Sequence, residues 1–275
     1  MRKKKIKVGK GTCKLTLMTG RFVDSHILPR ALTFIGKKGE KALQVQKDAP
    51  VLKRFQGWYD NMLCTSEGEE ILSQIDNKAI KLLRKNYLVW SGWPTIADGI
   101  PCDPSQISGD PGKTQVRTIE GVNFLPLKVF FMSILWRAAA STKEDMQEIM
   151  LSDNLLEKLR LATLTQDPLA KVDFPVFIYQ HNTRGHLHNL TPIMESMVFD
   201  FPPPYENREY QFCRIYMDGL VAYIALDADE ALIKNMGPLI LDSHDTLLLI
   251  AIPFDESRSL RNLKALLSSV KRQNR

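Results

Sequence analysis

The pattern of hydrophobic and polar positions predicts a short hairpin near the start of the chain. CKLTLM and FVDSHI alternate apolar and polar residues as strands do, and TGR between them is typical of a turn. A proline is tolerated in the first turn of a helix, so PRALTFI predicts a short helix that opens at Pro29. Residues 11–35 therefore predict a hairpin followed by a brief helix, and the polar, lysine-rich residues 36–56 predict a surface loop.

The strongest helical pattern lies in TSEGEEILSQIDNKAIKLLRKN, residues 65–86. Ser66 followed by Glu69 predicts a capping box at the start of this helix. Basic side chains near its C-terminal end complement the helix dipole. The apolar positions that recur at helical spacing are Ile71, Leu72, Ile75, Ala79, Leu82 and Leu83.

Beyond this helix the pattern predicts an α+β fold. Residues 90–113 are rich in Gly, Pro, Asp and Ser, which predicts a long loop or an inter-domain connection. Residues 124–140 and 143–165 predict two helices. From residue 174 the pattern changes to strands, in FPVFIYQ, MESMVFDF, YQFCRIYM, LVAYIAL and TLLLIAIPF. The Asp-Gly pair of MDGL favours a tight hairpin, and residues 258–275 predict a basic amphipathic helix.

The net charge of the chain is concentrated at its start. A chain of 275 residues with 44% hydrophobic and 25% charged residues has an ordinary globular composition. Without the six basic residues of positions 1–10, basic and acidic residues balance at 31 each. A basic arm of this kind can neutralise phosphates of nucleic acid, although it is equally compatible with a solvated tail that aids solubility.

The sequence predicts neither a secretory signal nor a membrane span. The basic arm is not followed by the apolar segment of a signal peptide, and no apolar run approaches the ~18 residues that a spanning helix needs. The longest candidate, FLPLKVFFMSILWRAAA, carries a proline and two basic residues and predicts a buried helix. Four scattered cysteines show no disulfide framework, so we expect a cytoplasmic protein.

Two segments together resemble a known enzyme family. CKLT and FVDSHILPRAL, followed by the later WYDNMLCTSEGEEIL, resemble nucleases of the HNH type, which form the ββα-metal class. They are most similar to a bacterial subgroup with the order Cys-x-x-Cys, then Ser-His-Ile-x-Pro, then Asn-Leu-Leu-Cys-x-x-Cys-Glu. The resemblance covers roughly residues 11–85. The Ser-His-Ile-x-Pro element matches fully, whereas each cysteine pair matches by half.

The resemblance implies a specific chemistry. Hydrolysis of a phosphodiester needs a base to activate water and a cation to stabilise negative charge. The resemblance implies that His26 is the base and that Asn61 orients it. It also implies a carboxylate that binds Mg²⁺ or Mn²⁺ near the start of the following helix, with Glu69 as the first candidate and Glu67 and Asp60 as alternatives.

Each of these residues also has a structural interpretation. His26 could be a hydrogen-bonded core histidine, and Asn61 could be a turn residue. Glu69 has a structural role if the capping box forms.

The sequence departs from the HNH pattern at the cysteines and before the histidine. It has Cys13-x-x-Thr16 and Cys64-x-x-Glu67 where the subgroup has two cysteine pairs. A structural zinc site normally needs four sulfur or nitrogen ligands, so we expect no structural zinc. Ser25 stands where many HNH enzymes have a metal-binding aspartate, which weakens the expected metal site.

A second candidate site lies in QHNTRGHLHN. This stretch holds His181, His186 and His188, and the His-x-His spacing places two imidazoles on one face of a strand. Three interpretations stay open: a metal site, a polar loop that contacts phosphate together with Arg184, or no function.

The sequence as a whole predicts an α+β protein in two parts. We expect a basic arm at 1–10, an HNH-like ββα unit at 11–90, a linker loop at 91–114, and a mixed domain of helices and antiparallel sheet at 115–275. The C-terminal domain could recognise substrate, bind a protein partner or form a homo-oligomer.

The leading functional hypothesis is a metal-dependent endonuclease that acts on DNA. Arg30 and the arm residues Lys3, Lys4 and Lys5 would hold phosphates. Small HNH proteins often serve bacterial anti-phage defence, and the resemblance implies that role here. The alternative hypothesis is a non-catalytic HNH-like subunit that binds nucleic acid or protein, without membrane association in either case.

Overall fold

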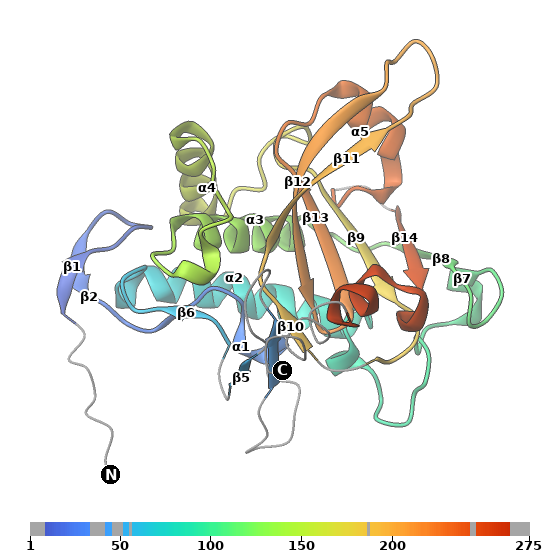
Figure 1. Ribbon diagram of the computed structural model, residues 1–275, viewed down its shortest axis with the longest axis horizontal. Coiled ribbons are helices and arrows are strands. Elements are labelled where there is room, and N and C mark those ends of the chain that lie inside the picture. The colour runs from blue at the N-terminus through green and yellow to red at the C-terminus, as the bar shows by residue number, and fades with distance from the viewer. Residues whose placement is uncertain are drawn as a thin grey trace, which may run out of the picture.

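A seven-stranded sheet is the largest element of the computed structural model (Figure 1). The structure describes residues 9–33, 42–45, 52–54, 57–185, 188–242 and 246–264. The strand order is β11-β12-β13-β9-β14-β8-β7, and its neighbours are antiparallel except for β9 and β14. The strands are β7 (Ile107–Ser108), β8 (Gln115–Glu120), β9 (Val176–His181), β11 (Ile193–Phe199), β12 (Arg208–Met217), β13 (Leu220–Ala225) and β14 (Thr246–Ile252).

Both faces of the central strands β9, β13 and most of β12 are covered. Along β9, Val176 and Ile178 face one hydrophobic cluster, whereas Phe177 faces another. Helix α3 (Leu125–Ala140) contributes to the first cluster, and α5 (Glu230–Met236) with residues 254–264 contributes to the second. Strands that are buried on both sides have no polar face, which explains the continuous apolar runs of the sequence. The five strand segments predicted from residue 174 onward are confirmed.

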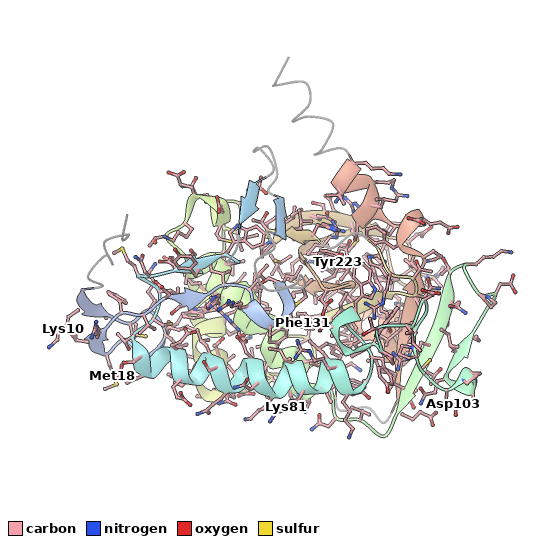
Figure 2. All side chains as sticks on the ribbon, turned by 90° about the horizontal axis from the view of Figure 1, so that it is seen from below. Lys10, Met18, Lys81, Asp103, Phe131 and Tyr223 are labelled. Carbon is pink, nitrogen blue, oxygen red and sulfur yellow. The ribbon has the colours of Figure 1, made fainter. Side chains whose placement is uncertain are left out.

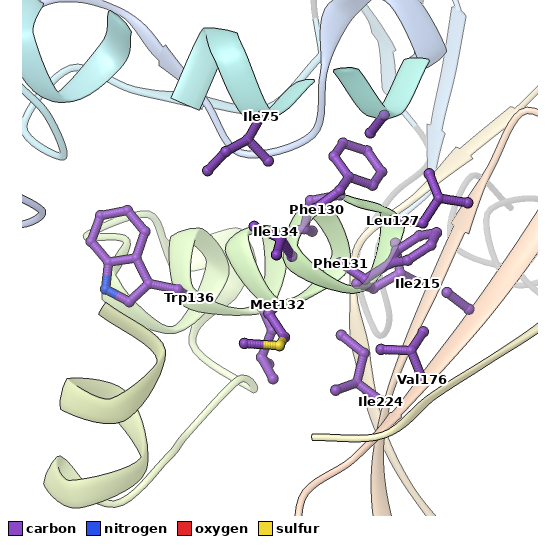
Figure 3. Close-up of a cluster of buried hydrophobic side chains, with 14 of the residues drawn as sticks. Ile75, Leu127, Phe130, Phe131, Met132, Ile134, Trp136, Val176, Ile215 and Ile224 are labelled. Atoms are coloured by element: carbon purple, nitrogen blue, oxygen red, sulfur yellow. The ribbon is translucent and has the colours of Figure 1, made fainter. Parts of the chain in front are cut away.

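The helix α3 lies at the centre of the molecule. Nearly all of its side chains are buried, as expected for a helix that is apolar on every side. Figure 3 shows it between α2 (Ser66–Lys85), which contributes Ile75, and the strands that contribute Val176 and Ile224. Helix α4 (Asp153–Thr165) packs against the same helix.

The N-terminal part is built from short strands around α2. The hairpin of β1 (Lys10–Thr12) and β2 (Thr19–Arg21) is followed by β3 (Ser25–His26), which pairs antiparallel with β6 (Tyr59–Asp60). Between them lie α1 (Arg30–Thr33), β4 (Ala42–Val45) and β5 (Leu52–Arg54), and β4 also pairs with β10 (His188–Leu190). Single turns of 3-10 helix are η1 (Trp90–Gly92), η2 (Pro104–Gln106), η3 (Glu144–Met146), η4 (Gly237–Leu239) and η5 (Phe254–Glu256).

One hydrophobic core joins the N-terminal part to the sheet. The same cluster contains Leu15 from the N-terminal turn, Leu83 from α2 and Leu249 from β14. The predicted boundary near residue 90 therefore does not separate two hydrophobic cores. The predicted linker at 91–114 includes η2 and β7, and β7 forms one edge of the large sheet.

The predicted strand CKLTLM is wrong. Residues 13–18 form a tight turn, in which the N–H of Cys13 donates to the carbonyl of Met18 and the N–H of Leu17 donates to the carbonyl of Cys13. TGR, the predicted turn, is strand β2. The alternation of apolar and polar residues suggested a strand here because Cys13 and Leu15 are both fully buried in the turn. Burial at every second position therefore arose without a strand.

The predicted capping box at α2 is also wrong. The N-cap is Thr65 rather than Ser66, and no side chain caps the helix there. The predicted helix itself, the helix α3, the short helix α1 and the Asp218–Gly219 hairpin turn are confirmed. The segment 143–165 splits into η3 and α4, and the predicted loop 36–56 contains β4 and β5. Of the C-terminal helix, residues 258–264 are helical, and residues 265–275 lie outside the described part.

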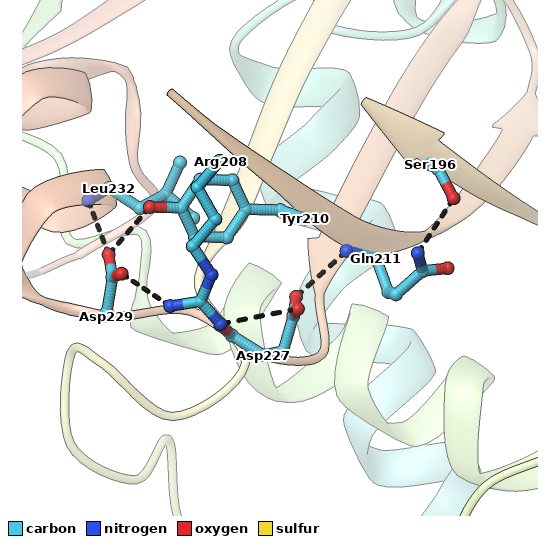
Figure 4. Close-up of polar contacts among 7 residues, drawn as sticks. All are labelled: Ser196, Arg208, Tyr210, Gln211, Asp227, Asp229 and Leu232. Atoms are coloured by element: carbon cyan, nitrogen blue, oxygen red, sulfur yellow. Dashed lines mark hydrogen bonds and ion pairs between the residues drawn. The ribbon is translucent and has the colours of Figure 1, made fainter. Parts of the chain in front are cut away.

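A polar network fixes the outer end of β12 (Figure 4). Arg208 forms ion pairs with Asp227 and Asp229, and the Tyr210 hydroxyl donates to Asp229 over 2.8 Å. Asp229 also caps α5 by accepting from the N–H of Leu232. These carboxylates therefore hold the loop before α5 against the ribbon of β11 and β12.

The helices in the described part of the chain include none with the length and apolar character that a membrane span requires.

Candidate functional site

Helix α2 presents one face to the core and another to a small open pocket. Its buried positions Gly68, Leu72, Ile75, Ala79 and Leu83 follow helical spacing, which turns a neighbouring row of side chains away from the core. That row lines a cavity of about 190 Å³ together with residues of β3 and α1. The residues that line the cavity are His26, Pro29, Arg30, Ala31, Glu69, Ser73, Asp76, Asn77 and Ile80.

His26 is half-buried at the end of β3. It pairs across the ladder with Tyr59, and the two rings are 6.4 Å apart. Its carbonyl oxygen accepts a hydrogen bond of 3.0 Å from Nη1 of Arg137. Burial and the positive charges of Arg30 and Arg137 lower the pKa of His26 below its usual value, although Asp76 opposes the decrease. This shift favours the neutral imidazole, which is the form that can accept a proton.

Glu69 lies in the first turn of α2 and lines the same cavity. Burial raises the pKa of Glu69, although the nearby Ser25 and Arg137 moderate the increase. Its Oε2 atom is buried, and Ser25 moderates the pKa through a hydrogen bond to this carboxylate. Because the capping box does not form, the structural role that the sequence offered for Glu69 is absent.

Asp76 is a residue of the site that the sequence interpretation missed. Its carboxylate binds the guanidinium of Arg137 through both oxygens, at 2.5 and 3.1 Å. Asp76 lies seven positions after Glu69, which places both carboxylates on one face of α2, two turns apart. That spacing was the available signal. The partner Arg137, in contrast, comes from α3 and had no signal in the sequence pattern.

Asp60 has a structural role in this fold. It is fully buried, and its carboxylate accepts hydrogen bonds from the N–H of Met62, from the Ser141 hydroxyl, and from both the N–H and the hydroxyl of Thr142. Burial alone would raise the pKa of Asp60, but these hydrogen bonds lower it below its ordinary value. Asp60 does not line the cavity of His26, and its oxygen atoms are engaged by backbone and hydroxyl donors.

The other predicted residues lie at different places. Glu67 is exposed beside Gly20, outside the cavity. Asn61 is half-buried in the turn after β6, and no hydrogen bond among the described residues joins it to His26. Arg30 lines the cavity at the start of α1. The predictions for Lys3, Lys4 and Lys5 lie outside the described residues.

Cys13 and Cys64 come together against Gly68 in the first turn of α2. A hydrogen bond with Cys64 lowers the pKa of Cys13 to about 4, and the same bond raises the pKa of the Cys64 thiol. Gly68 of α2 lets the sulfurs approach, because a Cβ atom there would lie 2.6 Å from Sγ of Cys13. The N–H of Thr16 donates to the same sulfur over 3.5 Å. The two half-matching cysteine segments are therefore neighbours in space.

The histidine-rich segment packs into the hydrophobic cluster on the face of the large sheet that α3 does not cover. His181 is buried, with Nε2 3.2 Å from the hydroxyl of Ser259, and His188 stacks on Tyr216 with ring centroids 4.4 Å apart. Burial lowers the pKa of His181 to about 4. Arg184 donates to backbone carbonyls of the loop at 93–97. These contacts favour a structural role, and His186 lies outside the described residues.

Within the described part of the chain, no three His, Cys, Asp or Glu side chains are close enough to hold a metal ion on their own. Magnesium usually takes only one or two carboxylates from a protein, with water and substrate phosphate completing its shell. A single carboxylate in the cavity lining, such as that of Glu69, fits that smaller requirement.

Comparisons with protein-family models, with curated proteins and with solved structures find no match to this chain.

Proposed function

We propose that the chain is a metal-dependent, HNH-like endonuclease that hydrolyses phosphodiester bonds of DNA. The observation that carries the proposal is the shared cavity, which is lined by the imidazole of His26 from β3 and by the carboxylate of Glu69 from α2. A base and a cation-binding group in one open pocket are the two components that this hydrolysis requires.

In this proposal His26 is the general base. A base is effective when it is unprotonated at the working pH, and burial together with the neighbouring arginines lowers the pKa of His26. The base would take a proton from the water that attacks the phosphorus atom. A positioned base of this kind contributes roughly 10²–10⁴-fold in rate.

Glu69 would hold Mg²⁺ or Mn²⁺ together with substrate oxygens. Such an ion, when bound, stabilises negative charge on the phosphate and on the leaving oxygen. Asp76 adds negative charge to the lining of the cavity, but both of its oxygens bind Arg137. Burial raises the pKa of Glu69, and a cation bound beside it would favour the charged form of the carboxylate.

The order of elements supports the resemblance to HNH enzymes. His26 ends β3, β3 pairs antiparallel with β6, and α2 follows β6 and carries Glu69. This is the strand, strand, helix order of a ββα unit, with α1, β4 and β5 inserted between the two strands.

Basic residues beside the cavity fit a polyanionic substrate. Arg30 lines the cavity, and Lys81 lies on the exposed side of α2 farther along the helix (Figure 2). Contacts of this kind neutralise phosphates and make binding depend on salt concentration.

A nicking assay tests this function directly. Purified full-length protein is incubated with supercoiled plasmid and Mg²⁺ or Mn²⁺, and the wild type is compared with His26→Ala, Glu69→Gln and the control Gln74→Ala. Gln74 is an exposed residue of α2 that does not line the cavity. We expect metal-dependent nicking by the wild type and the control, and a loss of at least about 100-fold in each site variant.

Two results contradict the proposal. Undiminished nicking by His26→Ala would eliminate the proposed base. Absence of nicking by the folded wild type, with salt-dependent retention of DNA on a column, would instead support the non-catalytic binding subunit.

A further inference from the structure

Arg137 is a buried arginine whose donors are all used. Its side chain is 1% exposed, in a helix whose other buried side chains are mostly apolar. A guanidinium has five N–H donors. Nε donates to the carbonyl of Ser133, Nη1 to the carbonyl of His26 and to Asp76, and Nη2 to Asp76 and to the Ser133 hydroxyl. Such complete satisfaction fixes the position of this side chain.

The partners of Arg137 belong to three elements. Ser133 lies in α3 itself, one turn before the arginine, and holds the guanidinium against its own helix. The other two partners are His26 of β3 and Asp76 of α2, and both residues line the candidate active site. Arg137 therefore joins the central helix to both walls of the cavity.

We propose that Arg137 is a positioning residue for the reaction at His26, through which α3 sets the geometry of the site. The inference rests on the proposed nuclease function. Arg137 orients the backbone of the base from one side and holds Asp76 from the other, so the distance between β3 and α2 is set by one rigid fork. The site would then be incomplete without the part of the chain beyond residue 120, and α3 would be the route by which that part controls cleavage.

Arg160 also joins the N-terminal part to the helices beyond residue 120, but it does not contact the cavity. Arg160 of α4 also reaches into the N-terminal part, where Nη1 donates to the carbonyl of Leu15 over 2.6 Å. Arg160 pairs with Glu157 and does not touch a residue that lines the cavity. It is therefore a matched control: a buried arginine that joins the same parts of the chain without contacting the site.

The test compares Arg137→Lys and Asp76→Asn with Arg160→Lys in the full-length protein. A lysine at 137 keeps the positive charge but cannot bind His26 and Asp76 through a fork. We expect kcat of Arg137→Lys to fall by roughly 10–100-fold with KM within about threefold, because the base is displaced while the DNA contacts remain. Arg160→Lys is expected to keep both constants within about twofold, since its side chain lies away from the reacting groups.

A second measurement does not depend on cleavage. The ring of His26 is titrated by NMR in each variant. Asp76→Asn removes a negative charge that raises the pKa of His26, so the titration midpoint is expected to fall, whereas Arg160→Lys leaves it unchanged. Asp76→Asn preserves side-chain volume, which keeps the test available if Arg137→Lys does not fold.

The outcomes separate the two proposals. If the wild type nicks DNA and Arg137→Lys retains full kcat, the positioning role is overturned and the nuclease function stands. If the wild type does not nick DNA, the nuclease function fails. In that case, an unchanged His26 midpoint in Asp76→Asn would also overturn the linkage between α2 and the histidine.

Discussion

Replacing Asp60 with asparagine separates a structural carboxylate from a metal ligand. Asp60 is fully buried and accepts four hydrogen bonds, which tie the turn after β6 to the segment that follows α3. Two of its donors are backbone N–H groups, of Met62 at 2.8 Å and of Thr142 at 2.7 Å, and they lie on different carboxylate oxygens. Asparagine has nearly the same shape but only one acceptor oxygen.

The magnitude follows from these two N–H groups. Hydroxyl donors can rotate and accept from the new amide, but a backbone N–H cannot. Whichever way the asparagine amide is oriented, one of the two backbone donors faces an NH₂ group. An unsatisfied buried donor costs about 1–3 kcal/mol, and exchanging a charged acceptor for a neutral one in the remaining hydrogen bonds adds about 1 kcal/mol. We therefore expect Asp60→Asn to lower the free energy of unfolding by about 2–4 kcal/mol.

Urea denaturation followed by circular dichroism measures this change. In a thermal melt of the same variant, the melting temperature should fall by roughly 4–16 °C, at about 2–4 °C per kcal/mol for a chain of this size. The effect should depend on pH. Because the pKa of Asp60 is lower in the folded chain than in the unfolded chain, its contribution is complete above pH 4 and is lost as the pH falls through the folded value. The difference in the free energy of unfolding between the wild type and Asp60→Asn should shrink over the same range of pH.

Asp24→Asn is the matched control. It removes the same charge from an exposed position two residues before His26, and we expect a change within about 0.5 kcal/mol. A stability of Asp60→Asn equal to that of the wild type, combined with complete loss of nicking, would refute the structural role and restore Asp60 as a metal ligand.

Two further predictions concern α2. Helix propensity alone predicts that Gly68→Ala stabilises the protein by up to about 1 kcal/mol, but the new Cβ would lie 2.6 Å from the buried sulfur of Cys13. We expect a net loss of about 1–3 kcal/mol in urea unfolding, which Cys13→Ala should partly reverse in the double variant; a stabilised single variant would contradict this packing. Because burial raises the pKa of Glu69, its charged form opposes folding above its ordinary pKa of 4.5. Glu69→Gln should therefore melt at a higher temperature than the wild type at pH 7 and at an equal temperature near pH 4, and a lower melting temperature at pH 7 would show that the carboxylate stabilises the fold.

The local pattern of apolar and polar residues was sufficient to predict a helix or strand where a segment has one strong periodicity. The helix at 66–85 and the strands from residue 174 onward follow directly from spacing, because one stripe or one run of apolar residues must be buried. It failed for CKLTLM, where a tight turn buries Cys13 and Leu15 and imitates a strand. It failed again at the start of α2, where the chain enters the helix at Thr65 and the predicted cap does not form.

The sequence by itself determined that His26 and Glu69 are candidates, since their residue types and order resemble a nuclease motif. Helical spacing places Asp76 on the same face of α2 as Glu69, but the sequence interpretation did not name it. Only the tertiary structure decided which candidates share a cavity. It placed Asp60 and Glu67 elsewhere and brought Arg137 from α3 to the backbone of His26. The physical reason is that periodicity specifies which face of an element is buried, whereas the partner of that face depends on how distant elements pack. A buried guanidinium finds its acceptors only after α2, α3 and β3 have assembled.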